Sequence, residues 1–180
     1  MCSRYFTKEE ENGARIDVHP MDLADVWIPG PGGHAVCARM RWGFPGGEGQ
    51  NLVFNARAES AAWKSMFSES LAYRRCAVPA LGFYEWNAAK EKVSFQRPDK
   101  KRLYFAAFYQ QIEGENRFVI LTTKANVSME RIHDRMPLIL ERKEAGAWLS
   151  AGKAYESLLQ KLPPELSCQM EYEQQCFEFL

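Results

Sequence analysis

Several common signatures are absent from this sequence. Its 180 residues carry no net charge, with 23 basic and 23 acidic side chains, and its longest purely apolar run, Leu103 to Tyr109, has seven residues. A membrane-spanning helix needs roughly 20 apolar residues, so no membrane association is expected. The opening residues, MCSRYFTKEEE, place three glutamates where a secretory signal has an apolar core. We therefore expect a cytoplasmic protein, nucleoid-associated if it is bacterial.

Metal and disulfide patterns are also missing. The five cysteines form no C-x-x-C pair, and the three histidines, at positions 19, 34 and 133, are scattered. Neither a disulfide framework, a metal site nor a cofactor is expected. No repeat or low-complexity tract divides the chain, and the Gly-rich and Pro-rich segments 29–33 and 45–49 are too short to be anything but loops. We expect a single domain, 1–180, that is a monomer.

The remaining composition is that of a folded protein: 46% of residues are hydrophobic and 13% aromatic. Short β-rich runs separated by turn residues predict strands at 34–44, 52–56, 74–86, 92–96, 102–112 and 117–125. A helix is predicted at 59–67, with Ala62, Trp63, Met66 and Phe67 on one face, and further short helices near 128–133, 143–150 and 155–162. This pattern indicates an α+β fold built on a curved antiparallel sheet with short flanking helices.

Charge is unevenly distributed along the chain. Residues 61–135 carry 13 basic and 8 acidic side chains, whereas the segments on either side carry more acidic than basic ones. This local excess can support a short phosphate-contacting groove. A solvated surface explains it equally well.

Cys2 is the most informative single residue. When Met1 is removed, Cys2 carries a free α-amine next to its thiol, and both groups are partly available as nucleophiles near neutral pH. Such a 1,2-aminothiol condenses with an aldehyde to an imine, which the thiol then closes to a thiazolidine. The alternative is a small residue in a frayed terminus.

Two further motifs carry candidate polar residues. NARAES (Asn55 to Ser60) puts Asn55 and Arg57 where a strand meets a helix: an amide that can hydrogen-bond an amine or carbonyl, and a guanidinium that can bind phosphate. Helix capping explains either residue equally well. GFYEW (Gly82 to Trp86) surrounds Glu85 with aromatic residues, which disfavour its ionisation and suit a proton shuttle. An outward-facing glutamate on a strand is the alternative.

The last two motifs are weaker alone. IHDRMP (Ile132 to Pro137) supplies His133, a residue able to transfer protons at neutral pH or to serve only in structure. RWGF (Arg41 to Phe44) puts Trp42 and Phe44 beside Arg39 and Arg41. Aromatic residues interleaved with arginines suit single-stranded nucleic acid, and they suit a hydrophobic core equally well.

Together, in this order and at this spacing, these segments match the motifs of a single family. MCSRY, RWGF, NARAES, GFYEW and TTKANVSMERIHDRMP (Thr122 to Pro137) strongly resemble the SRAP family, the abasic-site processing proteins also called SOS-response-associated peptidases. The motifs cover about residues 1–140. Ser3 stands where the family usually has glycine, and the segment after Trp42 is compressed to GFPGGEG.

The resemblance implies a fold, a function and site residues. The sheet is expected to be barrel-like. The active-site residues fall on Cys2, Asn55, Glu85 and His133, and the family binds single-stranded DNA and couples covalently to the aldehyde of an abasic site, shielding it from strand cleavage in DNA repair. The family arginines that contact DNA fall on Arg4 and Arg57, and its aromatic wedge on Trp42 and Phe44. We include Arg39, Arg41 and Arg135 among the expected DNA contacts.

The chemistry implied is covalent crosslinking through a Schiff base, with lyase activity if ring closure fails. The peptidase name is interpreted as autoproteolytic removal of Met1. Two other classes stay open on the residues alone: an N-terminal-nucleophile cysteine hydrolase, which attacks an amide with Cys2, and a noncatalytic single-strand-binding module, which is indifferent to Cys2.

Overall fold

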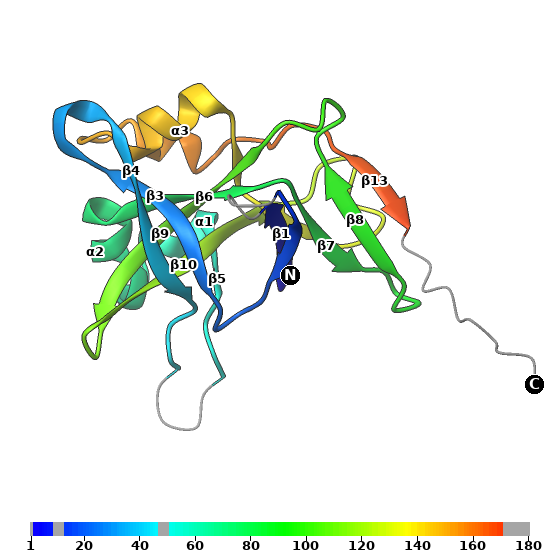
Figure 1. Cartoon of the computed structure of the whole chain (residues 1–180), viewed down its shortest axis with the longest axis horizontal. Coiled ribbons are helices and arrows are strands. Elements are labelled where there is room, and N and C mark those ends of the chain that lie inside the picture. Colours follow the sequence, from blue (N-terminus) through cyan, green and yellow to red (C-terminus); the bar gives the residue numbers. More distant parts are fainter. Residues whose placement is uncertain (1, 9–12, 47–50, 171–180) are drawn as a thin grey trace, which may run out of the picture.

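A five-stranded barrel forms the centre of the protein (Figure 1). The computed structural model describes residues 2–8, 13–46 and 51–170. The barrel strands are β3 (Leu23–Pro29), β4 (Ala35–Trp42), β6 (Arg75–Ala80), β9 (Leu103–Ile112) and β10 (Glu115–Lys124). Each pairs with the next in the order β4–β3–β6–β9–β10, and β10 pairs with β4 to close the ring. The α+β, barrel-like fold expected from the sequence is confirmed.

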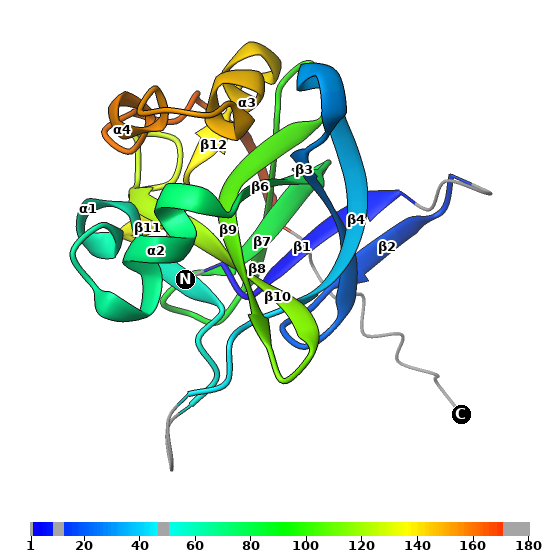
Figure 2. The same ribbon diagram turned by 90° about the vertical axis from the view of Figure 1, so that its left-hand side faces the viewer.

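A second, open sheet lies beside the barrel and includes the first described strand (Figures 1 and 2). Its order is β13 (Ser167–Met170), β8 (Lys92–Gln96), β7 (Gly82–Trp86), β1 (Arg4–Lys8) and β2 (Arg15–Val18). Three short strands extend the barrel: β5 (Asn55–Arg57), β11 (Arg135–Pro137) and β12 (Ile139–Leu140). Because β5 pairs with β10, the NARAES motif begins on the barrel wall.

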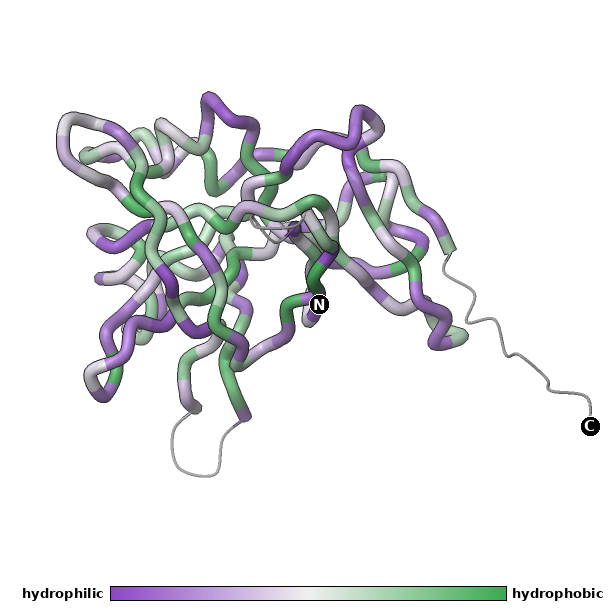
Figure 3. The backbone as a smooth tube through the Cα atoms, viewed as in Figure 1, coloured by the Kyte–Doolittle hydropathy of each residue, from purple (hydrophilic) through white to green (hydrophobic). Residues whose placement is uncertain are grey.

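Alternation along the barrel strands produces two cores, since successive strand residues face opposite sides. On β10, Phe118 and Ile120 join an inner core that also contains Cys2, whereas Val119 and Leu121 join an outer core beneath the helices. Hydrophilic residues gather at turns such as the β8–β9 connection, 97–102 (Figure 3). Cys2 therefore belongs to the barrel interior and not to a frayed end.

Four short α-helices pack outside the barrel, and a 3-10 turn, η1 (Pro31–Gly33), joins β3 to β4. The helices are α1 (Ala58–Ala61), α2 (Ser65–Tyr73), α3 (Arg142–Leu149) and α4 (Tyr155–Leu158). The predicted helix at 59–67 is in fact α1 and α2, interrupted at 62–64. Its predicted buried face is wrong for Trp63, which is 86% exposed, while Phe67 is buried. Because the helix is interrupted at 62–64, the buried positions of α1 and α2 do not fall on one continuous helical face.

Other predictions had mixed outcomes. The predicted strands at 34–44, 92–96, 102–112 and 117–125 correspond to β4, β8, β9 and β10, and 74–86 holds both β6 and β7. The helix predicted near 143–150 is α3, while 128–133 forms turns instead of a helix. The sheet is not wholly antiparallel, because β10 runs parallel to β4 and to β5. No helix among the described residues is long and apolar enough to cross a membrane.

Candidate active site

Cys2 and Asn55 meet where β1 approaches the short strand β5. The Asn55 side chain donates a hydrogen bond from Nδ2 to the carbonyl oxygen of Cys2, at 2.8 Å. Its Oδ1 is buried and has no hydrogen-bond partner among the described residues. One end of this amide therefore fixes the backbone of Cys2, and the other is a free acceptor next to it.

The thiol of Cys2 is fully buried. Burial raises the pKa of this thiol well above its ordinary value, and the nearby carboxylate of Glu85 raises the pKa further, because both disfavour the thiolate. A contact of Sγ with the carbonyl oxygen of Arg4, at 3.8 Å, holds the side chain beside β1. The group is thus a neutral thiol at physiological pH.

Glu85 reaches this site from β7, the strand paired with β1. The pairing sets Tyr84 opposite Arg4 and Gly82 opposite Phe6. Gly82 permits this approach, because a Cβ there would lie 2.4 Å from both the Phe6 ring and the Phe95 carbonyl oxygen. Glu85 is 4% exposed. The burial of this glutamate, expected from the sequence, is confirmed, and its role as a proton shuttle stays a prediction.

His133 lies on the loop between β10 and β11. Met129, four residues earlier, packs in the inner core that contains Cys2, and its carbonyl accepts the His133 backbone N–H. Nδ1 of His133 accepts a hydrogen bond from the Arg135 backbone N–H at 2.9 Å. The same nitrogen lies 2.9 Å from a carboxylate oxygen of Asp134, with which a protonated imidazole forms an ion pair. The His133 side chain is thus held by its two neighbours in the loop.

Arg57 and Arg135 differ in their availability. Arg57 is exposed and caps the start of α1, two residues after Asn55 on the same face of β5. Arg135 instead forms a two-pronged ion pair with Glu59, at 2.7 and 2.8 Å, and donates to the carbonyl oxygen of Thr122. Its hydrogen bonds join β11 to α1 and β10, so the structure gives Arg135 a positioning role in place of the expected DNA contact.

The other predicted arginines occupy separate places. Arg4 begins β1, with its guanidinium 5.4 Å from the centroid of the Trp86 ring. Arg41 pairs with Glu115 at 2.7 Å and donates to the Met21 carbonyl oxygen, which commits it to the barrel seam. Arg39 lines a cleft of about 380 Å³ between β1–β2 and β3–β4. Of these three, the strand order leaves only Arg4 next to Cys2.

Trp42 and Phe44 are core residues, which corrects the expectation that they contact DNA bases. Trp42 is fully buried, stacks on Phe118 with ring centroids 6.2 Å apart and donates from its indole N–H to the Phe54 carbonyl oxygen. Phe44 is 1% exposed and packs on Phe108. Both rings belong to the core, and Phe44 also borders a hollow at the start of α2. The hydrophobic-core alternative was correct for both.

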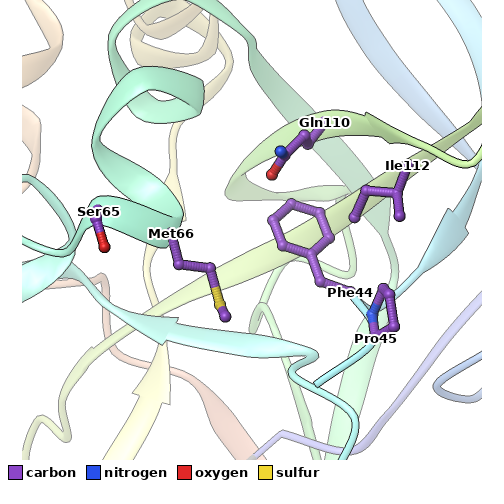
Figure 4. A pocket seen from close by; sticks show the side chains of 6 residues that line it. All are labelled: Phe44, Pro45, Ser65, Met66, Gln110 and Ile112. Carbon is purple, nitrogen blue, oxygen red and sulfur yellow. The ribbon is translucent and has the colours of Figure 1, made fainter. Parts of the chain in front are cut away.

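A shallow hollow of about 440 Å³ lies at the start of α2 (Figure 4). Its walls are mostly apolar, and two polar side chains border it; the lining residues are Phe44, Pro45, Ser65, Met66, Gln110 and Ile112. The exposed Trp63 lies two residues before Ser65. The sequence prediction grouped Trp63 with Met66 and Phe67 on one face of a continuous helix over 59–67, and it missed this surface because the helix is interrupted at 62–64.

With this geometry in hand, comparison with known proteins decides the family. The sequence matches the family described as SOS response associated peptidase (SRAP) over residues 1–174. The chain belongs to the SRAP family. The match extends over the barrel and the second sheet, so the family resemblance of the motifs applies to the whole described fold.

Curated SRAP relatives share about a third of their aligned residues with this chain. YoqW of Bacillus subtilis, named an abasic site processing protein, is 34% identical over 138 residues, covering 69% of this chain and 62% of YoqW. YedK of Escherichia coli, with the same descriptive name, is 30% identical over 116 residues, covering 60% of this chain and 52% of YedK. The chain thus spans about three fifths of the length of YoqW.

Solved structures support the fold of this SRAP protein. A crystal structure of a protein from Bordetella bronchiseptica superimposes with a TM-score of 0.80 at 22% identity, covering 96% of this chain and all of that one. A protein from Bacteroides thetaiotaomicron gives a TM-score of 0.74 at 23% identity, covering 86% of this chain and 76% of that one. Both likenesses concern architecture.

Proposed function

We propose that this protein processes abasic sites in DNA by forming a covalent adduct between Cys2 and the ring-opened sugar. The observation that carries the proposal is the contact of Asn55 with Cys2: one amide atom holds the Cys2 carbonyl at 2.8 Å, and the other is a buried, free acceptor. Relatives named abasic site processing proteins support the same substrate. DNA carrying an abasic site is the proposed partner, and no cofactor takes part.

The first proposed step creates the nucleophile. Water hydrolyses the peptide bond between Met1 and Cys2, which gives Met1 a carboxylate and Cys2 a free amine. We propose that the protein does this itself, in agreement with the peptidase name of the family. The free Oδ1 of Asn55 is then the acceptor that orients this amine.

The amine, and not the thiol, forms the first bond to the sugar. Burial and Glu85 keep the thiol protonated, so the thiolate is scarce. The amine nitrogen adds to the aldehyde carbon C1′ to give a carbinolamine, and loss of water gives the imine. The thiol sulfur then adds to the imine carbon while its proton passes to the nitrogen, which closes the thiazolidine.

Glu85 and His133 are proposed to move the protons. Glu85 is buried beside the thiol, where its carboxylate can take the proton that the amine loses on adding to C1′, pass it to the departing hydroxyl of the carbinolamine, and later carry the thiol proton to the nitrogen. His133, whose Nδ1 contacts the Arg135 backbone N–H and the Asp134 carboxylate, is proposed to give an imidazole proton to the ring oxygen when the sugar opens. Ring closure removes the imine, so it suppresses β-elimination of the 3′ phosphate.

Two cations are proposed to hold the DNA backbone. Arg57 leaves β5 on the same face as Asn55, and Arg4 starts the strand that follows Cys2. A single strand fits this proposal better than a duplex, because the reacting sugar must reach a thiol inside the barrel core. Binding of single-stranded and duplex oligonucleotides tests this preference.

The test is a crosslinking assay. A single-stranded oligonucleotide with one abasic site is incubated with the wild type, with Cys2→Ala and with Cys37→Ala, which removes an exposed cysteine as a matched control. Products are separated on a denaturing gel, and each protein's intact mass is measured. We expect a heat-tolerant adduct from wild type and Cys37→Ala, from protein that lacks Met1, and none from Cys2→Ala.

Three outcomes contradict the proposal. If Cys2→Ala forms an adduct with normal yield and heat stability, the adduct is not a thiazolidine. Absence of an adduct from processed, folded wild type removes the crosslinking function, and turnover of a small amide would then favour an N-terminal-nucleophile hydrolase. Equal DNA binding by Cys2→Ala and wild type without any adduct would favour a noncatalytic binding module.

A further inference from the structure

Trp63 is an exposed aromatic residue shortly after the segment that contains Asn55 and Arg57. Its side chain is 86% exposed, whereas Trp42 and Trp148 are fully buried. It lies in the turn between α1 and α2, directly before Lys64. An indole combines a large apolar face with an N–H donor, and such side chains are favoured where proteins bind other molecules.

The turn holds Trp63 outward firmly. Ala61 on one side is fully buried, and Phe67 on the other is 5% exposed. The Trp63 backbone N–H donates to the Ser60 carbonyl at 3.1 Å, and the Lys64 carbonyl accepts from the N–H groups of Phe67 and Ser68, each at 2.9 Å. The backbone is thus fixed at both ends, and the outward ring needs little further ordering to bind a ligand.

The position of Trp63 relates it to Cys2 through β5 and α1. Asn55, which contacts Cys2, and Arg57 lie on one face of β5, and α1 begins at the next residue. Arg57 and Trp63 are six residues apart, joined by the four residues of α1 and the turn at 62–64. Six residues of chain span at most about 20 Å even when extended, so Arg57 and Trp63 can contact the same short stretch of a DNA strand.

Charges around Trp63 favour a polyanion. Among the described residues, no carboxylate lies within ion-pair distance of Arg57 or Lys64. The negative charge of Glu59, which lies between them in the sequence, is paired with Arg135. A cation, an aromatic ring and a second cation thus follow one another along this segment. This is the arrangement by which proteins bind single-stranded nucleic acid, with phosphates on the cations and a base on the ring.

The hollow at the start of α2 continues this surface. Met66, 43% exposed, reaches over it, and Ser65 and Gln110 supply polar edges (Figure 4). Its volume, about 440 Å³, exceeds that of a single base and leaves room for the one that follows Trp63. Its lining is apolar with few polar groups, which suits the face and edge of a nucleobase.

We propose that Trp63 stacks on a base of the DNA strand next to the abasic site, while Arg57 and Lys64 contact the phosphates on either side. This inference rests on the proposed function for its ligand. It replaces the aromatic contact expected from Trp42 and Phe44, whose rings are buried. Trp63 is thereby a substrate-positioning residue and not part of the covalent chemistry.

The test measures DNA binding and crosslinking separately. The full chain, as wild type, Trp63→Ala and Trp63→Phe, is titrated with an oligo-dT that lacks an abasic site, and tryptophan fluorescence and anisotropy are recorded. Loss of one base–aromatic stack raises Kd about 5- to 100-fold, so we expect Trp63→Ala to bind at least 5-fold more weakly and Trp63→Phe to recover most of the affinity. Fluorescence quenching by DNA should be weaker in both variants than in wild type, and the remainder is expected from partly exposed tryptophans such as Trp86 beside Arg4.

Tyr73→Ala is the matched control. Tyr73 is also an exposed aromatic, 81% exposed, but it lies at the far end of α2 beside Ser150 and Tyr155. Its loss should leave Kd within 2-fold. Urea midpoints for all variants verify folding, which is expected because the Trp63 side chain makes no core contact.

The outcomes separate this inference from the proposed function. Trp63→Ala with a wild-type Kd overturns the stacking role, whatever the abasic oligonucleotide does. An adduct formed by wild type alongside that result leaves the crosslinking function standing. Trp63-dependent binding without any adduct does the reverse: stacking is supported and the covalent function fails.

Discussion

The buried thiols of Cys2 and Cys76 make the free energy of unfolding depend on pH. Burial raises the pKa of both thiols well above the ordinary value near 8.5. Above that ordinary pKa the unfolded chain loses these protons, whereas the folded chain keeps them. The unfolding free energy therefore falls as pH rises past about 8.5, by up to about 1.4 kcal/mol per pH unit for each thiol.

The sign is testable with urea unfolding between pH 7 and 10. Cys76→Ala should show about half the wild-type loss of stability per pH unit, because one of the two buried thiols is gone. Cys168→Ala removes an exposed cysteine and should follow wild type. A wild-type stability that is constant or rises across this range would contradict the assignment.

Asn55 offers a second prediction at this scale. Asn55→Ala removes the bond to the Cys2 carbonyl, worth about 1–1.5 kcal/mol, so single-turnover adduct formation should slow about tenfold. Asn55→Asp should slow it further, because a carboxylate oxygen then faces that carbonyl and Glu85 gains a like charge nearby. Equal rates for both variants and wild type would remove Asn55 from the mechanism.

Among the secondary-structure elements, α2 and α3 are joined by one buried side chain, Arg75. Its guanidinium donates to the carbonyl oxygens of Trp148 at 2.7 Å, Leu71 at 3.0 Å and Ser150 at 2.7 Å, and to that of Ala72. These carbonyls lie at the C-terminal ends of the two helices, where a cation is favourable. One arginine on β6 thus anchors both helices to the barrel.

Replacing Arg75 should loosen both helices together. Arg75→Met leaves two buried carbonyls, of Trp148 and Leu71, and two partly buried ones without this donor, so we expect a loss of about 2–4 kcal/mol in unfolding free energy. Arg75→Lys keeps the charge but not the planar fork, and should recover only part of it. Urea denaturation measures both. A loss below 0.5 kcal/mol for Arg75→Met would contradict the anchoring role.

The sequence predicted these elements unequally. Apolar and aromatic runs bounded by turn residues located β8 at 92–96 and β9 at 102–112, and β9 reads as a continuous apolar run because both of its faces are buried over its first six residues. The strands β1, β2 and β3 were not predicted, because their short sequences mix charged with apolar residues, and because β1 and β3 also pair with strands far along the chain, β7 and β6. The grouping of Cys2, Asn55 and Glu85 came from motifs, and periodicity alone could not have supplied it.

Aromatic residues next to arginines were the hardest to assign. Trp42 and Trp63 have similar local sequences, each beside a basic residue, yet one is fully buried and the other 86% exposed. Their difference arises from tertiary contacts: Trp42 ends a barrel strand, and Trp63 occupies the break between two helices. The local sequence around each tryptophan does not indicate whether it is buried or exposed.

At the scale of the whole molecule, the barrel closes through the parallel pair β4–β10. This pairing sets Arg41 opposite Arg117, two like charges. Glu115 lies between them, 2.7 Å from Arg41 and 2.9 Å from Arg117. The carboxylate therefore offsets a repulsion at the seam that closes the barrel.

Glu115→Gln should expose that repulsion. We expect a loss of about 1 kcal/mol at low salt, and less at 1 M salt, because the pair is partly exposed and screened. Adding Arg41→Gln to Glu115→Gln should restore part of the loss, which a double-mutant cycle of melting temperatures measures. Glu113→Gln, an exposed glutamate in the adjacent turn, is the control. Additive effects of Glu115→Gln and Arg41→Gln would contradict the model of the seam.

The β4–β10 pair, which closes the barrel, also determines when the candidate site forms during folding. Arg41 and Glu115 are 74 residues apart, and Asn55 and Cys2 are 53 apart. Contacts so distant in the chain form slowly, because loop-closure entropy must be overcome first. A nascent or partly folded chain thus holds Cys2 without Asn55 or Glu85 beside it. In the proposed mechanism, aldehyde capture is in this way restricted to molecules whose barrel has already closed.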